Sequence, residues 1–167
     1  MLNIIYLAAL AVFLLVMSVL TYYSSSWLAS ITDPRSVVTN YEYYSSASGN
    51  FLWISTAILL ILANIILWKT RKVWAFWSTL LYFAVFIILH TFWLNASFVQ
   101  YKKDNGLLAG GIYLSPLVGV ILLIIVAVIV FLNQLLVLRM HDKMYAKETQ
   151  VEPLTEDLPE NSEENSQ

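Results

Sequence analysis

The sequence predicts an all-α membrane protein: a four-transmembrane-helix antiparallel bundle followed by a disordered acidic C-terminal tail. Of its 167 residues, 59% are hydrophobic and only 12% are charged, with a mean hydropathy of +0.71. A soluble domain is about half apolar and about a quarter charged, so a soluble fold is excluded. The charges are also absent from four long stretches, at 1–32, 43–68, 73–101 and 105–138. We interpret these stretches as the membrane-crossing segments.

Four apolar segments fit the thickness of a bilayer, at about 2–23, 51–68, 73–93 and 116–138. A hydrocarbon layer of about 30 Å needs roughly 20 residues in helical form, and a helix satisfies its own backbone hydrogen bonds in lipid. The first segment lacks a basic n-region and exceeds a typical signal-peptide core, so we expect it to be a retained helix. Residues 1–147 therefore form one transmembrane domain.

The connections between the segments differ in length. The basic turn at 69–72 is so short that the second and third helices must form a hairpin. We expect two longer loops, at 24–50 and 94–115, with a turn at Asp33-Pro34 in the first of them. Ser115 and Pro116 are typical of an N-cap and a first helical position, which places the start of the fourth helix there.

Basic residues favour one side of the membrane. Six of them (Lys69, Arg71, Lys72, Arg139, Lys143, Lys147) flank the helix ends that share one side, whereas three (Arg35, Lys102, Lys103) lie on the other. The positive-inside rule then predicts a multi-pass plasma or inner membrane protein with both termini in the cytoplasm. The tail at 148–167 has seven acidic residues and no base, a composition typical of disorder, and it is a candidate contact for a cytoplasmic partner.

The few polar residues inside the spans share helix faces, because positions three, four and seven apart stack on one side. Asn64 and Asn133 are predicted to bond between helices on the cytoplasmic side of the bundle. Gly111, Ser115 and Gly119 form a small-residue run that favours close packing, either within the bundle or between copies of the chain.

His90 is the ionisable residue inside a span, and such residues often mark functional sites. One hypothesis is a speculative ligand-binding site formed by His90, Tyr82, Trp93 and Thr56, to which Asp33 or Glu42 could fold back from the loop. The other is a neutral imidazole that bonds to Thr21, Thr56 or Tyr82. We expect no cofactor and no metal, because the chain has no cysteine, no acid lies within a span, and His141 lies on the opposite side from His90.

These patterns favour a non-enzymatic protein, because no nucleophile with a base and an orienting acid is evident. We predict an accessory subunit or interaction scaffold of a larger membrane complex, in contact with the lipid bilayer and with a membrane-protein partner or further copies of itself. No nucleic-acid partner is expected. The alternative is a pocket for a lipid or quinone-like molecule around His90, used for catalysis or transport. A channel is disfavoured by the lack of pore-lining charge.

Overall fold

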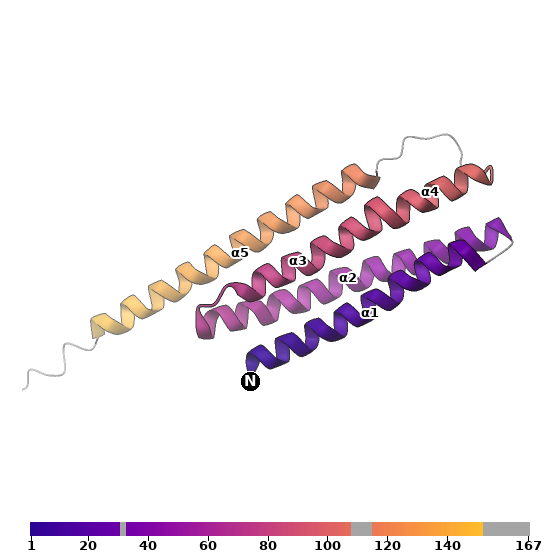
Figure 1. The fold of residues 1–167 in the computed structure, drawn as a ribbon. Coiled ribbons are helices and arrows are strands. Elements are labelled where there is room, and N and C mark those ends of the chain that lie inside the picture. The colour runs from indigo at the N-terminus through magenta and orange to yellow at the C-terminus, as the bar shows by residue number, and fades with distance from the viewer. Residues whose placement is uncertain (31–32, 108–114, 152–167) are drawn as a thin grey trace, which may run out of the picture.

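The computed structural model shows an all-α bundle, which confirms the predicted fold class (Figure 1). Residues 1–30, 33–107 and 115–151 are described by the structure, without the side chains of 27–30, 115 and 145–151. The elements are α1 (Leu2–Ser30), α2 (Pro34–Thr70), α3 (Trp74–Ile88), the π-helix η1 (Leu89–Leu94), α4 (Asn95–Asp104) and α5 (Ser115–Val151). Within this part of the chain, four helices are long and apolar enough to cross a membrane, since α3, η1 and α4 run on as one.

The helices extend beyond the predicted spans, and this corrects the two expected loops. Residues 24–30 and 34–50 are helical, with Asp33 as the N-cap of α2, and residues 95–104 form helix α4. The spans were predicted from hydropathy, which indicates the part of a helix that lies in lipid. It does not indicate where the helix begins or ends. At the other terminus α5 continues to Val151, so the predicted disordered tail begins with four helical residues, and the rest of it lies outside the described residues.

Capping residues fix both ends of α2. The Asp33 carboxylate accepts hydrogen bonds from the backbone N–H groups of Arg35 and Ser36 and from the Ser36 hydroxyl. These bonds favour the ionised form and hold the pKa of Asp33 below its usual value. Pro34 follows at the first helical position, where its missing N–H costs nothing. At the other end, Arg71 adopts a left-handed conformation with φ 54° and ends the helix.

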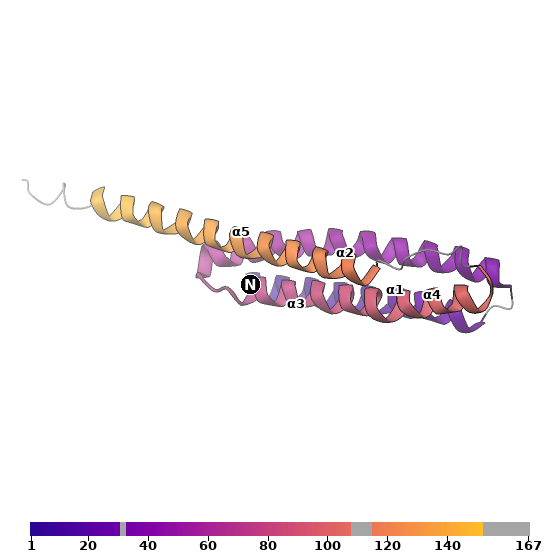
Figure 2. The ribbon, with the colours of Figure 1, turned by 90° about the horizontal axis from the view of Figure 1, so that it is seen from above.

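The four long helices pack as a diamond in cross-section. α2 and α3 form the central pair, joined by the short turn at 71–73, while α1 and α5 lie on opposite sides of that pair (Figures 1 and 2). We call the end that holds this turn the turn end, and the opposite end the far end. The N-terminus and the C-terminal end of α5 both lie at the turn end (Figure 1).

Parallel helices stand at matching heights. Three hydrogen bonds between them, Tyr6 to Ala75, Thr21 to His90 and Asn64 to Asn133, each join residues 69 apart in the sequence. The hairpins α1–α2 and α3–α5 are therefore side by side without a vertical offset. By this register α5 begins at the level of Ser46, so the far ends of α1, α2 and α4 rise beyond it.

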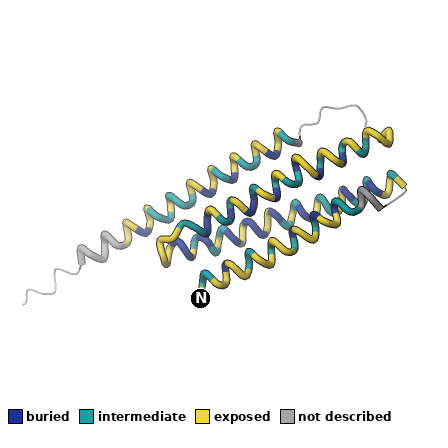
Figure 3. Tube along the Cα trace, viewed as in Figure 1, coloured by how far each residue is buried: buried dark blue, intermediate teal, exposed yellow. Residues whose placement is uncertain are grey.

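The core lies between the helices along the α2–α3 pair. Its fully buried side chains include Tyr6, Met17, Leu59, Ile66, Phe76 and Phe83. The two side helices bury less: 17% of the most apolar window of α1 and 11% of that of α5 are buried, against 39% for α2 (Figure 3). The outward faces of α1 and α5 are thus the main apolar surfaces available to lipid.

Candidate functional site

His90 lies in the π-helix η1, where the chain makes one extra-wide turn between α3 and α4. Its Nε2 atom is 3.2 Å from the Thr21 hydroxyl and 3.2 Å from the Ser48 hydroxyl, and its Nδ1 atom is 3.4 Å from Ser48. The three residues come from α1, α2 and η1, so the imidazole joins three helices. π-helical turns are frequent at functional sites, since they re-aim side chains that a regular helix would stack.

The other predicted ligand-binding residues do not join His90 at one place. Tyr82 bonds to Ser55 at 2.7 Å, two helical turns along α2 from the Ser48 contact. Thr56 is buried, and its hydroxyl has no hydrogen-bond partner among the described residues. Trp93 is 58% exposed on the outside of the bundle. The structure thus brings His90 to Thr21, as one hypothesis expected, and to Ser48, which the sequence had assigned to a loop.

Neither acid suggested as a partner for His90 is used that way. Asp33 caps α2 at its first turn, and Glu42 is an exposed residue whose carboxylate lies 4.0 Å from the Lys102 ammonium group. Both belong to the continuous helix α2 or its cap, which holds them on the exposed far end. His90 therefore has hydroxyl partners and no carboxylate partner in these contacts.

A second polar cluster lies near the turn end, and its central residue was missed. The Tyr6 hydroxyl lies 2.8 Å from the Ala75 carbonyl oxygen, 2.6 Å from the Ser78 hydroxyl and 2.8 Å from the Thr79 hydroxyl. No role was assigned to Tyr6 from the sequence. Its position inside an otherwise apolar segment was the available signal.

Three of the predicted helix-packing residues, Asn64, Asn133 and Gly119, lie where α5 meets its neighbours. Asn133 donates from Nδ2 to Asn64 Oδ1 at 2.9 Å, and Asn64 donates to the Leu60 carbonyl oxygen at 3.0 Å. Gly119 faces η1 so closely that a Cβ atom there would lie 2.6 Å from Thr91 Cγ2. Gly111 lies outside the described residues, and the side chain of Ser115 is not described.

No known protein family, curated protein or solved structure matches this chain. Its chemistry is therefore argued from the geometry alone. Across residues 1–30, 33–107 and 115–151, no group of three or more His, Cys, Asp or Glu side chains is placed to hold a metal ion. The His90 cluster offers hydrogen bonds from two hydroxyl groups, which suits the anchoring of one helix against two others.

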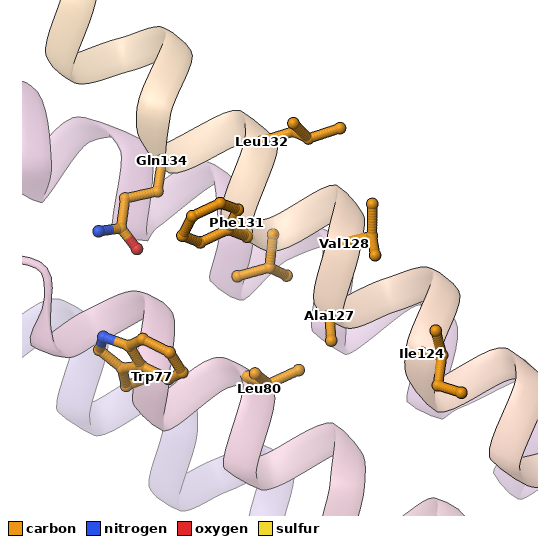
Figure 4. A pocket seen from close by; sticks show the side chains of 9 residues that line it. Trp77, Leu80, Ile124, Ala127, Val128, Phe131, Leu132 and Gln134 are labelled. Carbon is orange, nitrogen blue, oxygen red and sulfur yellow. The ribbon is translucent and has the colours of Figure 1, made fainter.

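Two grooves flank α5 towards the turn end. The α3–α5 groove has a volume of about 380 Å³ and is lined by Trp77 and Leu80 of α3 and by seven residues of α5, from Ile124 to Gln134 (Figure 4). The α2–α5 groove, of about 400 Å³, lies beside Asn64, Asn133 and Trp68. A third, open hollow lies along α4 at the far end. His90 lines none of the three.

Charged side chains gather at the two ends of the bundle. Arg71 at the α2–α3 turn forms an ion pair with Asp142 of α5, and the buried imidazole of His141 packs against the Trp68 ring at 5.8 Å. Sequence reasoning missed the ion pair, because the two residues are 71 positions apart and only the fold brings them together. These contacts hold the segment of α5 around His141 and Asp142 against the α2–α3 turn.

Proposed function

We propose that this protein is a non-enzymatic accessory subunit or interaction scaffold of a larger membrane complex. The supporting observation is a three-helix platform at the far end, formed by residues 24–30 of α1, 34–43 of α2 and α4 (Asn95–Asp104). α2 has 37 residues and is therefore about 55 Å long, whereas a bilayer with its headgroups measures about 40–45 Å. The platform thus extends beyond the membrane surface.

The platform has a small core of its own, which favours a defined binding surface over a flexible loop. Tyr41 stacks on Phe98 with ring centroids 3.8 Å apart, and Leu94 and Val38 complete the cluster. Lys102 and Glu42 link α4 to α2 above it. A rigid surface loses little conformational entropy when it binds, so this arrangement suits a docking role.

Tyrosine side chains, most of them exposed, lie on α1 and α2 at the base of the platform. Tyr22, Tyr23, Tyr44 and Tyr43 form a chain of ring contacts across α1 and α2, and Tyr43 is 69% exposed. Tyrosine is enriched both in membrane-interface belts and at the centres of protein interfaces. A belt would anchor the bundle at the headgroups, and the rings that rise above it would be free to contact a partner.

For the orientation, we propose that the turn end is cytoplasmic and that the platform lies on the opposite side of a plasma or inner membrane. Five described basic residues and one acidic residue lie at the turn end, whereas the far end has three of each. The excess follows the positive-inside rule. The acidic tail would then be available to a cytoplasmic partner.

The alternative function, a pocket for an apolar ligand around His90, has less support. Hydroxyl groups from two helices already occupy the imidazole nitrogens, and the three grooves described above do not reach it. Trp93, which such a pocket would need, faces outward. We therefore retain the scaffold as the proposed function.

The test is site-specific crosslinking in native membranes. A photoreactive benzoylphenylalanine at Tyr43 should give a discrete higher-mass adduct with one partner protein, identified by mass spectrometry. The matched control is the same probe at Leu15, which is exposed at membrane depth on α1 and should give no such adduct. A Tyr43→Glu variant should also lose the partner on native gels in mild detergent. A protein that stays monomeric and yields no adduct at Tyr43 would refute the scaffold.

A further inference from the structure

The α3–α5 groove is the apolar hollow that α5 leaves open towards the surrounding lipid. Its walls are aliphatic and aromatic, and Trp77 on α3 and Phe131 on α5 are both more than half exposed at its edges. Figure 4 shows Leu80 and Ala127 facing each other across the groove, with Gln134 on α5 above Trp77 at one end. The lining surface is apolar throughout, so Gln134 contributes its aliphatic part to the wall, and a hollow of this kind has the form of a site for a single acyl chain.

Gln134 is the polar side chain in this lining, and it lies within the predicted fourth span. An amide without a hydrogen-bond partner in hydrocarbon is costly, so a polar ligand atom beside it would be stabilising. The ion pair between Arg71 and Asp142 shows that Asp142 of α5 lies at the same depth as the α2–α3 turn. Gln134 is eight residues from Asp142, about 12 Å along the helix. Trp77, which also lines the groove, is six residues from Arg71 and so lies at a similar depth.

Basic residues follow the lining residues of the groove towards the turn end. Lys72 precedes α3, and Arg139 and Lys143 follow Gln134 on α5, all of them exposed. The one described acid at this level, Asp142, is paired with Arg71. Among the side chains that the structure describes, five basic residues and one acid lie at the turn end, and three of each lie at the far end. Basic pockets between transmembrane helices attract anionic lipid headgroups.

The lining is less suited to a transmembrane helix. Helix pairs in membranes approach through small residues such as Gly, Ala and Ser, and here Ala127 stands among Trp, Phe, Leu, Ile and Val side chains. A flexible acyl chain can follow such an uneven wall, because it needs no regular surface of its own. The lining chemistry and the basic residues towards the turn end point to the same occupant.

We propose that the α3–α5 groove binds an anionic phospholipid from the leaflet at the turn end. One acyl chain lies against Leu80, Ala127 and Phe131, the Gln134 amide donates to an ester carbonyl, and Lys72 and Arg139 attract the phosphate. The site is separate from the far-end platform, so a failure of the scaffold proposal would leave it standing. Bound lipid would fill the space between α3 and α5 and hold the side helix in place.

Native mass spectrometry of the purified protein tests the site. Phosphatidylglycerol and phosphatidylcholine with identical acyl chains are added in turn, and the retained lipids are counted. We expect one phosphatidylglycerol to bind at least tenfold more tightly than phosphatidylcholine. The double variant Lys72→Gln with Arg139→Gln should lose most of this preference, since each basic residue near a lipid surface contributes about fivefold. Lys102→Gln with Lys103→Gln at the far end is the matched control and should keep it.

Two further variants separate the headgroup from the chain. Gln134→Leu should weaken both lipids alike, by about threefold, because both carry the same ester groups. Ala127→Phe should block the groove and abolish the tightly bound lipid, and gel filtration with circular dichroism checks that the variant remains folded. Equal affinity for the two lipids, or lipid retention unchanged in the charge variant, would overturn the proposal. A dimer that disappears on Ala127→Phe would instead assign the groove to a second copy of the chain and overturn it as well.

Discussion

At the residue scale, sequence reasoning named Asn64 with Asn133 and gave Thr21 as one of three candidate partners of His90, but it missed Tyr6 and Ser48. Asn64 and Thr21 were placed by helical periodicity and depth, and the structure joins them to Asn133 and His90. Ser48 was lost because its segment lacks hydrophobicity and was expected to be a loop. Its contact with His90 depends on α2 continuing as a helix through that segment. Side-chain partners that are 42 to 73 residues apart in the sequence are brought together by helix packing, and composition and hydropathy do not predict which helix faces meet.

The Asn64–Asn133 bond should stabilise the bundle. We expect Asn64→Leu or Asn133→Leu to lower the free energy of unfolding by about 0.6 to 1.7 kcal/mol, as for other hydrogen bonds between membrane helices. Each single variant leaves one amide without its partner in a weakly polar environment. The double variant should therefore lose less than the sum of the two single losses. Unfolding of the detergent-solubilised protein measures all three.

A suitable control for this cycle is Asn50→Leu, because Asn50 is exposed on α2. It should leave the unfolding free energy nearly unchanged. Single variants at 64 and 133 that unfold like the parent protein would contradict a stabilising role for the pair, and fully additive losses would show that the two amides act separately.

At the element scale, the number and order of the helices follow from hydropathy, but their lengths do not. The apolar windows locate the part of each helix inside the hydrocarbon layer, whereas helix ends depend on caps such as Asp33 and on the left-handed Arg71. Between Pro34 and Asn50, Gly49 is the one strong helix breaker after the first turn, and the structure accommodates it. The π-helix at Leu89–Leu94 had no local sequence signal. α5 approaches this π-helix closely at the contact of Gly119 with Thr91.

That contact predicts a sharp difference between two glycines. Gly119→Ala would put a methyl group 2.6 Å from Thr91 Cγ2 and 2.7 Å from Thr91 Oγ1, so either η1 or α5 must shift. Overpacking of this kind costs about 1–3 kcal/mol and outweighs the gain of about 0.5–1 kcal/mol from replacing glycine in a helix. Gly49→Ala, with no atom within 4 Å of its new methyl group, should be neutral or stabilising.

Thermal unfolding in detergent compares the two variants under identical conditions. The melting temperature of Gly119→Ala should fall below that of the parent protein, and that of Gly49→Ala should stay level or rise. Equal melting temperatures would mean that α5 can shift at Gly119 without loss of stability. The close contact between Gly119 and Thr91 would then not stabilise the position of α5.

At the scale of the whole molecule, the antiparallel bundle was predictable because few architectures satisfy backbone hydrogen bonds in lipid. The short turn at 71–73 also made the α2–α3 hairpin inevitable. The diamond arrangement was not predictable, since it depends on which faces meet, and neither was the three-helix platform. Because contacting residues of parallel helices are 69 positions apart, the two hairpins have the same position along the bundle axis. With this register, α5 ends before the other helices at the far end and extends past them at the turn end. This uneven outline gives each end of the molecule a different surface.

The orientation of these two surfaces can be decided because the chain has no cysteine, so that each introduced thiol is unique. Thr70→Cys places an exposed thiol at the turn end, and Ser97→Cys places one on α4 at the far end. In intact cells, a membrane-impermeant maleimide should label position 97 but not position 70. Position 70 should be labelled only after the membrane has been permeabilised. The basic excess at the turn end is the physical reason, since Lys and Arg are retained on the cytoplasmic side during insertion. The reverse pattern would place the platform and its tyrosines in the cytoplasm, and any partner of the acidic tail outside the cell.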